Sequence, residues 1–308
     1  MKSLTTKNLV DVELIEKAEA DENNSSTSPR LPHPIPYQGS KRNLAPKILQ
    51  VLEGRTFRRF VEPFAGSAAM TIAAAHAQLA KEYIIGDSLT PLIGIWQQIL
   101  SSPHQLATAY EDVWHGQLAH NDDYYHCIRD EFNRTQDPAL LLYLLARCVK
   151  NALRFNQQGQ FNQSHDKRRL GMRPNKMHKE IQGAYLLLAG HTAAIHGDFA
   201  QTIASATEQD LIYMDPPYEG TTTGTDKRYY QGLDRERLIT ILNDLQCRNV
   251  PFILSYDGRC GDKVYGEPLP YSLNLRHIEL FAGRSSQSTL SGRAEVTVES
   301  LYLSKNLC

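Results

Sequence analysis

Short apolar runs alternate with segments of helical periodicity from about residue 31 onward. The run "RRFVEPF" predicts a strand, the small-residue segment "SAAMTIAAAHAQLA" predicts a helix, and "EYIIGDS" predicts a second strand. A helix over residues 44–52 comes before them. A strand, a helix and a second strand in this order form a right-handed βαβ unit, which is the kernel of a parallel sheet.

The middle of the chain follows a different pattern. From Thr90 to Lys179 the apolar positions have helical spacing without a convincing strand, and the segment ends in basic residues. The α/β rhythm then returns with "HTAAIHGDF", "DLIYMDPPY", a helix from Asp234 to Arg248 and the strand "PFILSYDG". The C-terminal "EVTVESLYLS" alternates in the manner of an edge strand.

These patterns predict an α/β fold in three parts. Residues 31–95 and 190–308 form a sheet domain, and residues 96–189 form an inserted helical domain. Residues 1–30 are expected to be a flexible polar arm, in which a short helix could precede the linker "NNSSTSPR".

Composition narrows the class of protein. The 308 residues are 41% hydrophobic and 22% charged, as in a globular protein with a sizeable core. The formal net charge of −1 means that any surface for nucleic acid must be a local patch. The sequence has no membrane-length apolar run and no secretory signal, and its five cysteines lack metal-ligand spacing. We therefore expect a reduced, cytoplasmic setting without a membrane or a structural metal.

The stretch "LIYMDPPYEG" carries the first candidate chemistry. Two consecutive prolines end a strand and stiffen the backbone that follows Asp215. The segment is either a rigid surface loop or a preset group of hydrogen-bond acceptors. In the second case Tyr218 would form an aromatic lid over a flat ring that bears an amine.

A second group of residues points to a nucleoside. Gly66 lies at a strand-to-helix turn, but the full GxGxxG pattern is missing, which argues against a bound dinucleotide. Asp87, 21 residues later, suits hydrogen bonds to ribose hydroxyls, or it caps the helix beginning near Pro91. In "HGDF", Asp198 and Phe199 could bind and stack on an adenine, or Asp198 could cap a helix. A ribose contact without a pyrophosphate grip suits S-adenosylmethionine.

In order along the chain, several segments resemble the Dam-type DNA adenine-N6 methyltransferases whose target-recognition region lies between the cofactor and catalytic motifs. "YQGSKRNLAPKIL" is similar to the family's Tyr/Trp-x-Gly-Gly-Lys motif, with Ser40 replacing the second glycine. "FVEPFAGSAAM" is similar to its cofactor loop, although the usual further small-Gly step is alanine here. "YIIGDSLTPLIGIWQQI" matches the segment with the ribose-binding acid. "YYHCIRDEFNRTQDP" and "RFNQQGQFN" match the helical region and recognition hairpin, and "DPPY" matches the catalytic motif. The match runs from about Pro36 to the C-terminus.

The resemblance implies a Rossmann-like sheet that binds S-adenosylmethionine and a helical DNA-recognition domain. The implied cofactor-site residues are Tyr37, Lys41, Glu62, Phe64, Gly66, Asp87, Asp198, Phe199 and Asp215. The implied catalytic residues are Asp215 and Pro216, as acceptors for the adenine amine, and Tyr218, which would stack on a base flipped out of the duplex.

The basic stretch "SHDKRRLGMRPNKMHK" lies where a DNA-reading loop is expected. It is either solvated surface or a site of phosphate and base-edge contacts, for which the candidates are Lys167, Arg168, Arg169 and Arg173. Asn156 and Asn162 belong to the hairpin and could shape it through local backbone bonds. Residues 282–293 form a second candidate loop, either for phosphate contacts or as a plain hairpin.

One departure limits the transfer from the family. Members that read GATC usually follow "FN" with a Pro-Phe-Gly-Arg/Lys run, whereas this chain has "QSHDKRRLGMRP". GATC specificity is therefore not implied.

Four alternatives stay open at this point: methylation of cytosine N4, methylation of RNA adenine, a non-catalytic DNA-binding protein with a methylase fold, and an NAD-dependent dehydrogenase. The last is disfavoured by the missing glycines. The expected partners are double-stranded DNA and, as a further candidate, a cognate restriction endonuclease. Action as a monomer is expected, since release of hemimethylated DNA needs no symmetric dimer.

Overall fold

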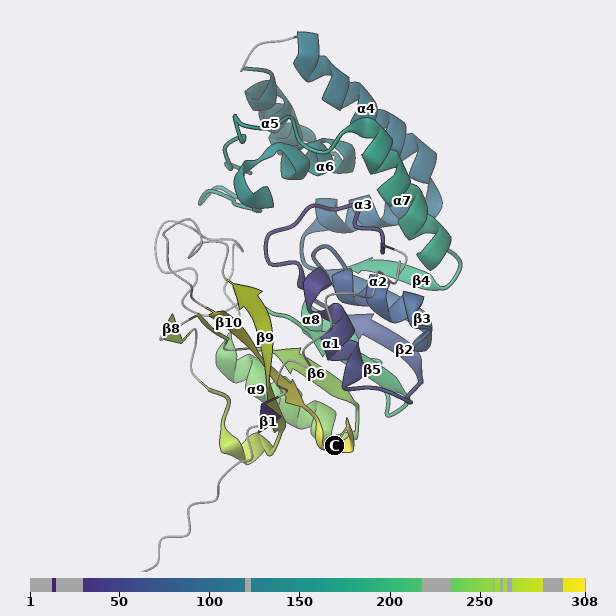
Figure 1. The fold of residues 1–308 in the computed structure, drawn as a ribbon, viewed down its shortest axis with the longest axis vertical. Coiled ribbons are helices and arrows are strands. Elements are labelled where there is room, and N and C mark those ends of the chain that lie inside the picture. Colours follow the sequence, from purple (N-terminus) through teal and green to yellow (C-terminus); the bar gives the residue numbers. More distant parts are fainter. Residues whose placement is uncertain are drawn as a thin grey trace, which may run out of the picture.

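The structure is a computed structural model, and it describes residues 13–14, 30–119, 123–217, 234–256, 258–260, 263–264, 268–284 and 296–307. Figure 1 shows a sheet flanked by helices in one part of the molecule and helices α4 to α7 gathered in the other. The strands are β2 (Phe57–Glu62), β3 (Ala80–Asp87), β4 (Thr192–His196), β5 (Asp210–Met214), β6 (Phe252–Ser255), β9 (Arg276–Arg284) and β10 (Val296–Leu303).

The sheet has the strand order β9-β10-β6-β5-β2-β3-β4. The five strands β6, β5, β2, β3 and β4 are parallel to one another, whereas β10 is antiparallel to both β6 and β9. Three two-residue strands extend it: β1 (Glu13–Leu14) beside β9, β7 (Arg259–Cys260) beside β10, and β8 (Lys263–Val264) beside β7. The predicted α/β fold is thus confirmed, with a parallel core that two antiparallel contacts of β10 turn into a mixed sheet.

The helices occupy the connections between these strands. They are α1 (Ala45–Gln50), α2 (Ala69–His76), α3 (Thr90–Ser101), α4 (Pro103–Ala119), α5 (Tyr124–Thr135), α6 (Pro138–Arg147), α7 (Pro174–Leu188), α8 (Phe199–Ile203) and α9 (Arg235–Cys247). Capping residues in the sequence determine where some of these helices begin. Asp137 and Asp234 cap α6 and α9 by accepting backbone N–H groups of the first turn.

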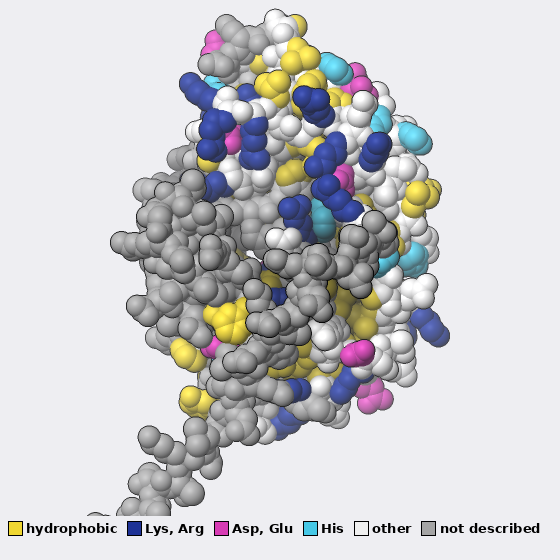
Figure 2. Space-filling view, viewed as in Figure 1, with side chains coloured by type: hydrophobic (Ala, Val, Ile, Leu, Met, Phe, Trp, Pro, Cys, Tyr) yellow, Lys and Arg dark blue, Asp and Glu magenta, His cyan; other side chains and the backbone are white. Residues whose placement is uncertain are grey.

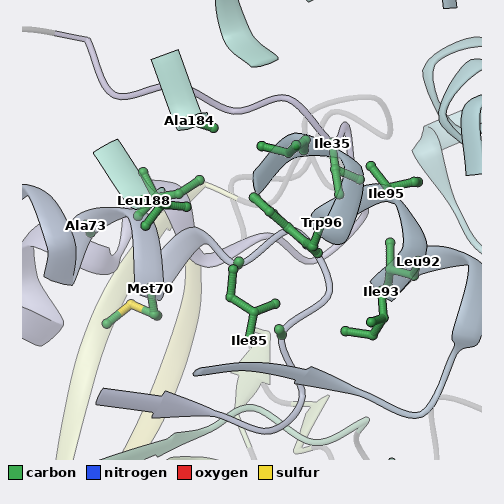
Figure 3. Packing of buried hydrophobic residues seen from close by; sticks show 14 of the residues in the cluster. Ile35, Met70, Ala73, Ile85, Leu92, Ile93, Ile95, Trp96, Ala184 and Leu188 are labelled. Atoms are coloured by element: carbon green, nitrogen blue, oxygen red, sulfur yellow. The ribbon is translucent and has the colours of Figure 1, made fainter. Parts of the chain in front are cut away.

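Helices cover both faces of the sheet, because successive side chains of a buried strand point to opposite faces. On β5, Leu211 and Tyr213 join the hydrophobic cluster that contains α2, α3 and α7. Ile212 and Met214 join the cluster that contains α8 and α9. Figure 3 shows side chains of α2, β3, α3 and α7 gathered in the first cluster around Trp96, which is fully buried.

Two features of the C-terminal part differ from the sequence predictions. The segment expected as an edge strand is β10, and it lies between β6 and β9. The alternation of polar and apolar residues that suggested an edge strand does not reflect exposure to solvent: Glu299 is only partly exposed, and residues 300–303 are all buried. The strand β9 was not predicted, and it takes up residues 282–284 of the expected loop 282–293; the rest of that loop lies outside the described residues.

The structure describes two residues of the N-terminal arm before residue 30, and it leaves the predicted division into domains untested. Within the arm, where a short helix was considered, Glu13 and Leu14 form a strand that pairs with Ile278 and Glu279. The other residues before Arg30 lie outside the described part. Helices α4 to α7 fall within residues 96–189, but their status as a separate domain stays a prediction.

No helix in the described part of the chain has the length and apolar character needed to cross a membrane. Among the same residues, His, Cys, Asp and Glu side chains form no group of three that could hold a metal ion.

A buried carboxylate anchors the start of β5. Asp210 is fully buried, and its oxygens accept hydrogen bonds from Arg58, Arg59 and the backbone N–H of Thr207. Burial alone would raise the pKa of Asp210, but the two guanidinium groups outweigh it and lower the pKa to about 2. The pair of arginines on β2 thus links β2 and β5 at the edge opposite their carboxyl ends.

We predict that Asp210→Ala lowers the free energy of unfolding by about 2 kcal/mol, because the backbone N–H of Thr207 loses its acceptor and two arginines lose their shared carboxylate. Urea denaturation at pH 7 checks this. The surface variant Glu131→Gln, which removes an exposed partner of Arg134, should leave the midpoint unchanged. Since the pKa of Asp210 is depressed, its contribution is present above the unfolded pKa and should disappear as the pH falls towards 2. Equal midpoints for both variants at pH 7 would contradict the prediction.

Candidate active site

Four of the predicted acidic residues lie at the carboxyl ends of parallel strands. Glu62 is the last residue of β2 and Asp87 the last of β3, while Asp198 and Asp215 closely follow β4 and β5. The carboxyl ends of parallel strands meet at one edge of a sheet, where α/β proteins bind ligands. The topology therefore collects acids that are up to 153 residues apart in the chain.

Lys41 is a buried cation at this edge. It begins a short 3-10 turn (Lys41–Asn43), and its side chain is only 8% exposed. Its Nζ lies 3.2 Å from Asp215 Oδ1 and 3.1 Å from both carboxylate oxygens of Glu299. Burial and the negative charge of Glu299 raise the pKa of Asp215 to about 6, although Lys41 pulls it down. Glu299 was not among the predicted site residues.

Glu62 adds a further carboxyl group next to Asp215. It is buried, and its Oε2 accepts hydrogen bonds from the backbone N–H and the hydroxyl of Thr71. Burial raises the pKa of Glu62 to about 8, and the nearby Asp215 adds to the rise, against the opposing hydrogen bonds from Thr71. Glu62 therefore carries a proton at neutral pH in the free protein.

The turn after β2 packs against Tyr37 and is held by Asp87. Gly66 has φ +50°, and a Cβ there would lie 3.0 Å from the Tyr37 ring, so both backbone and packing favour glycine. The carboxylate of Asp87 accepts the backbone N–H groups of Gly66 and Leu89, at 3.1 and 3.0 Å. The indole N–H of Trp96 donates to the Gly66 carbonyl.

Asp87 does not cap α3, which was one of its two predicted roles. The N-cap position of α3 is Leu89, and it has no side-chain cap bond. Burial raises the pKa of Asp87, and the backbone N–H groups partly offset the rise. The alternative role of Asp87, contact with a ribose, stays a prediction.

Ser40, the departure from the Gly-Gly-Lys motif, has a partner in the loop after β2. The Ser67 hydroxyl donates to Ser40 Oγ at 2.9 Å, and Ser67 is buried. This bond ties the segment that bears Lys41 to the loop that bears Gly66.

Phe199 forms an aromatic pair with Phe64, and its neighbour Asp198 binds an arginine that was not predicted. Asp198 caps α8 through the N–H of Ala200, which confirms its helix-cap alternative. It also forms a two-point ion pair with Arg237, which lowers the pKa of Asp198. The Phe64 and Phe199 rings stack with centroids 4.9 Å apart, so no base fits between them. The Arg237 guanidinium carbon lies 5.1 Å from the Phe199 centroid.

With this geometry in place, comparison with known proteins decides the family. The family model described as D12 class N6 adenine-specific DNA methyltransferase matches residues 37–283. The chain belongs to this family.

Individual relatives of this D12-class methyltransferase are distant. It is 27% identical over 233 residues to the DNA N-6-adenine-methyltransferase of Escherichia phage P1, a match that covers 72% of this chain and 29% of the phage protein. It is 26% identical over 276 residues to the type II methyltransferase M1.LlaDCHI of Lactococcus lactis subsp. cremoris, which covers 85% of this chain and 91% of that protein. The chain thus spans less than a third of the phage protein but most of the Lactococcus one.

Among solved structures, a SAM-dependent methyltransferase from Agrobacterium tumefaciens is similar at 12% identity and a TM-score of 0.34. The match covers 86% of this chain and 61% of that one. This likeness is too low to add to the strand order described above.

A buried acid organises the basic stretch of the methyltransferase. Asp166 is buried, and its carboxylate pairs with Arg168 at 3.0 Å and with Arg169 at 3.2 Å. The two arginines hold the pKa of Asp166 well below its usual range. Asp166 accepts from Nε and Nη2 of the Arg168 guanidinium, and the Arg168 side chain is still 84% exposed, so the guanidinium is held in place at the surface. Lys167 and Arg173 are exposed as well.

Figure 2 shows Lys and Arg side chains gathered over the helical part of the molecule.

The predicted hairpin is present as a bridge between Phe155 and Phe161. Asn156 Oδ1 accepts the N–H groups of Gln158 and Gln160, so Asn156 shapes the turn as predicted. Asn162 is exposed, and its backbone N–H donates to the Arg154 carbonyl.

The structure thus brings together Lys41, Glu62 and Asp215 in one cluster and Tyr37, Gly66 and Asp87 in another, joined by the Ser40–Ser67 bond. Pro216 is buried directly behind Asp215, and Tyr218 lies outside the described residues. Sequence reasoning missed Glu299, Ser255 and Arg237. No local motif marks these residues, because each meets its partner across a long sequence separation.

We predict that Glu62→Gln is more stable than the parent protein at pH 8. The folded pKa of Glu62 is raised, so the parent loses stability as the pH rises from the unfolded pKa towards about 8, and an amide removes this loss. The gain at pH 8 should be roughly 2 to 4 kcal/mol, at about 1.4 kcal/mol per pKa unit. Urea denaturation at pH 6, 7 and 8 measures it. The control Glu53→Gln changes an exposed residue, and its free energy of unfolding should match that of the parent at every pH. If the free energy of unfolding of Glu62→Gln also runs parallel to that of the parent from pH 6 to pH 8, Glu62 is not protonated in the folded protein.

Proposed function

We propose that the protein transfers a methyl group from S-adenosylmethionine to N6 of an adenine flipped out of duplex DNA, at a specific sequence. The observation that carries this proposal is the position of Asp215, directly after β5, with Lys41 against it and two prolines behind it. Membership of the adenine-N6 family supports the choice of adenine over cytosine.

The chemistry of the amine explains why this arrangement is useful. Adenine N6 is a poor nucleophile, because its lone pair is delocalised into the ring. As the nitrogen becomes tetrahedral its N–H bonds become more acidic, so fixed acceptors stabilise the transition state more than the ground state. Asp215 and the Pro216 carbonyl would be these acceptors. Tyr218 would stack on the flipped base.

The proposed cofactor site fits a cationic ligand. Asp215 and Glu299 share Lys41 as a basic partner, and the carboxyl group of Glu62 lies beside Asp215, so the cluster has an excess of acidic groups over this lysine. S-adenosylmethionine would supply the methyl group when bound, and its positive charge suits this excess. Asp87, between Gly66 and Leu89, would meet the ribose hydroxyls. The cofactor site would be completed by Tyr37, Phe64, Asp198 and Phe199. The adenine ring of the cofactor would lie beside the Phe64–Phe199 pair.

DNA contacts are proposed for the helical part, residues 96–189, as the recognition domain. Lys167, Arg168, Arg169 and Arg173 would meet phosphates or guanine edges, and the hairpin with Asn156 and Asn162 would be placed beside them. A cognate restriction endonuclease, action as a monomer and a cytoplasmic location belong to the same proposal. For the endonuclease, the support is the type II designation of the Lactococcus relative.

We predict that Asp215→Asn lowers methyl transfer by about 10²–10³-fold, the usual cost of losing one transition-state hydrogen-bond partner. The assay uses methyl-labelled S-adenosylmethionine and unmethylated genomic DNA, followed by nucleoside mass spectrometry. Cofactor binding, measured by calorimetry, should weaken, because Asp215 also belongs to the acidic cluster proposed for the cofactor, but it should remain measurable in the variant. In the parent, the rate should fall as the pH drops through about 6, because the protonated Asp215 carboxyl is a weaker acceptor for the amine N–H than the carboxylate.

Other outcomes of this assay would point elsewhere. Label in N4-methylcytosine would keep the acceptor mechanism and overturn the base assignment. Cofactor binding without label in DNA would indicate an RNA substrate or a non-catalytic protein.

We also predict that Asp166→Asn weakens DNA binding at least 5-fold, although the change removes a negative charge from a DNA-binding surface. The reason is that Asp166 orients Arg168 and Arg169. Fluorescence anisotropy with a short duplex measures the dissociation constant. The control Asp130→Asn removes a 72% exposed acid from α5 and should bind equally well or slightly better. Tighter binding by both variants would mean that Asp166 only repels DNA.

A further inference from the structure

Glu299 holds Lys41 more extensively than Asp215 does. Both oxygens of Glu299 lie 3.1 Å from Lys41 Nζ, whereas Asp215 approaches with Oδ1 at 3.2 Å. Glu299 comes from β10, 258 residues away from Lys41 in the chain. The carboxylate is itself fixed, since the buried Ser255 donates its hydroxyl to Oε2 at 3.2 Å and the Glu299 side chain is 13% exposed.

A lysine ammonium needs a second, fixed carboxylate partner if it is to bind one particular oxygen of Asp215. The side chain has four flexible bonds and three equivalent donors, so a single contact with Asp215 would leave its position loosely defined. With Glu299 taking two contacts from one side, the ammonium reaches Asp215 from a fixed direction. Among the residues that the structure describes, this contact engages Oδ1 of Asp215.

We propose that Glu299 is a positioning residue for methyl transfer: it fixes Lys41 so that the ammonium binds one oxygen of Asp215 and leaves the other for the substrate amine. The inference rests on the proposed function of Asp215 as the acceptor. Glu299 would act through Lys41 without touching the base.

The charges of the cluster give this role a distinctive signature. Glu299 helps Asp215 only while Lys41 lies between them, because the ammonium offsets the repulsion between the two carboxylates. Without Lys41, the same Glu299 would place an uncompensated negative charge close to Asp215. The effect of removing the charge of Glu299 should therefore change sign when Lys41 is absent.

The test is a double-mutant cycle of Glu299→Gln, Lys41→Met and the combined variant, assayed for kcat and KM on duplex DNA across pH 5 to 9. In the parent background, Glu299→Gln should lower kcat about 10-fold or more and change the KM for S-adenosylmethionine less than about 3-fold. Its acid limb should move to lower pH, because a negative charge that opposes ionisation of Asp215 is gone. In the Lys41→Met background, Glu299→Gln should raise kcat.

Controls separate this role from a structural one. Glu236→Gln removes the same charge from an 82% exposed position and should match the parent in kcat and pH profile. If Glu299→Gln folds poorly, Ser255→Ala removes only the hydroxyl that holds Glu299, and we expect a loss of a few-fold in kcat.

The outcomes are distinguishable. Independent losses from Glu299→Gln and Lys41→Met, with an unmoved acid limb, overturn the positioning role while the methyltransferase activity stands. No methylation by the parent protein, despite a correct fold, overturns the proposed function and this inference with it.

Discussion

An imbalance of charge at the carboxyl edge of the sheet is the constraint on which the site depends. Asp215 and Glu299 share Lys41 as a basic partner, and Glu62 places a third carboxyl group beside Asp215. Burial of acids is unfavourable, and the raised pKa values of Glu62 and Asp215 reflect that cost. A site of this kind gains when a cation or a hydrogen-bond donor arrives, and both are what methyl transfer to an amine would bring.

The scaffold tolerates this cost because backbone groups and a few polar side chains hold the surrounding loops. The backbone N–H of Gly66 donates to Asp87, and the carbonyl of Gly66 accepts the indole N–H of Trp96. The Tyr37 ring occupies the space that a side chain at position 66 would fill. The bond between Ser40 and Ser67 extends the frame to the segment with Lys41. Serine in place of the usual glycine is therefore accommodated by a specific contact with Ser67.

The parts of this structure that could be predicted from sequence are those encoded locally. The parallel strands β2, β3 and β5 were identifiable because their buried residues form apolar runs, and the acids at their carboxyl ends because each ends or follows such a run. Glu299 and Arg237 could not be identified, since their partners are 258 and 39 residues away and neither lies in a motif. The alternation of β10 was misleading, because a polar residue directed at a site gives the same pattern as solvent on an edge strand.

The candidate recognition surface and the candidate catalytic edge share one hydrogen-bonded frame. Arg169, which Asp166 holds, donates to the Cys148 carbonyl and contacts Asn151. The carbonyl of Asn151 accepts the backbone N–H of Gln38, and Gln38 lies between Tyr37 and the segment that leads to Lys41. With a net charge of −1, the protein attracts DNA only through local groups. Arg169 is anchored through Asn151 to the loop before Lys41. It is therefore suited to fix the position of bound DNA relative to the candidate catalytic edge, whereas a charge on a flexible surface side chain is not.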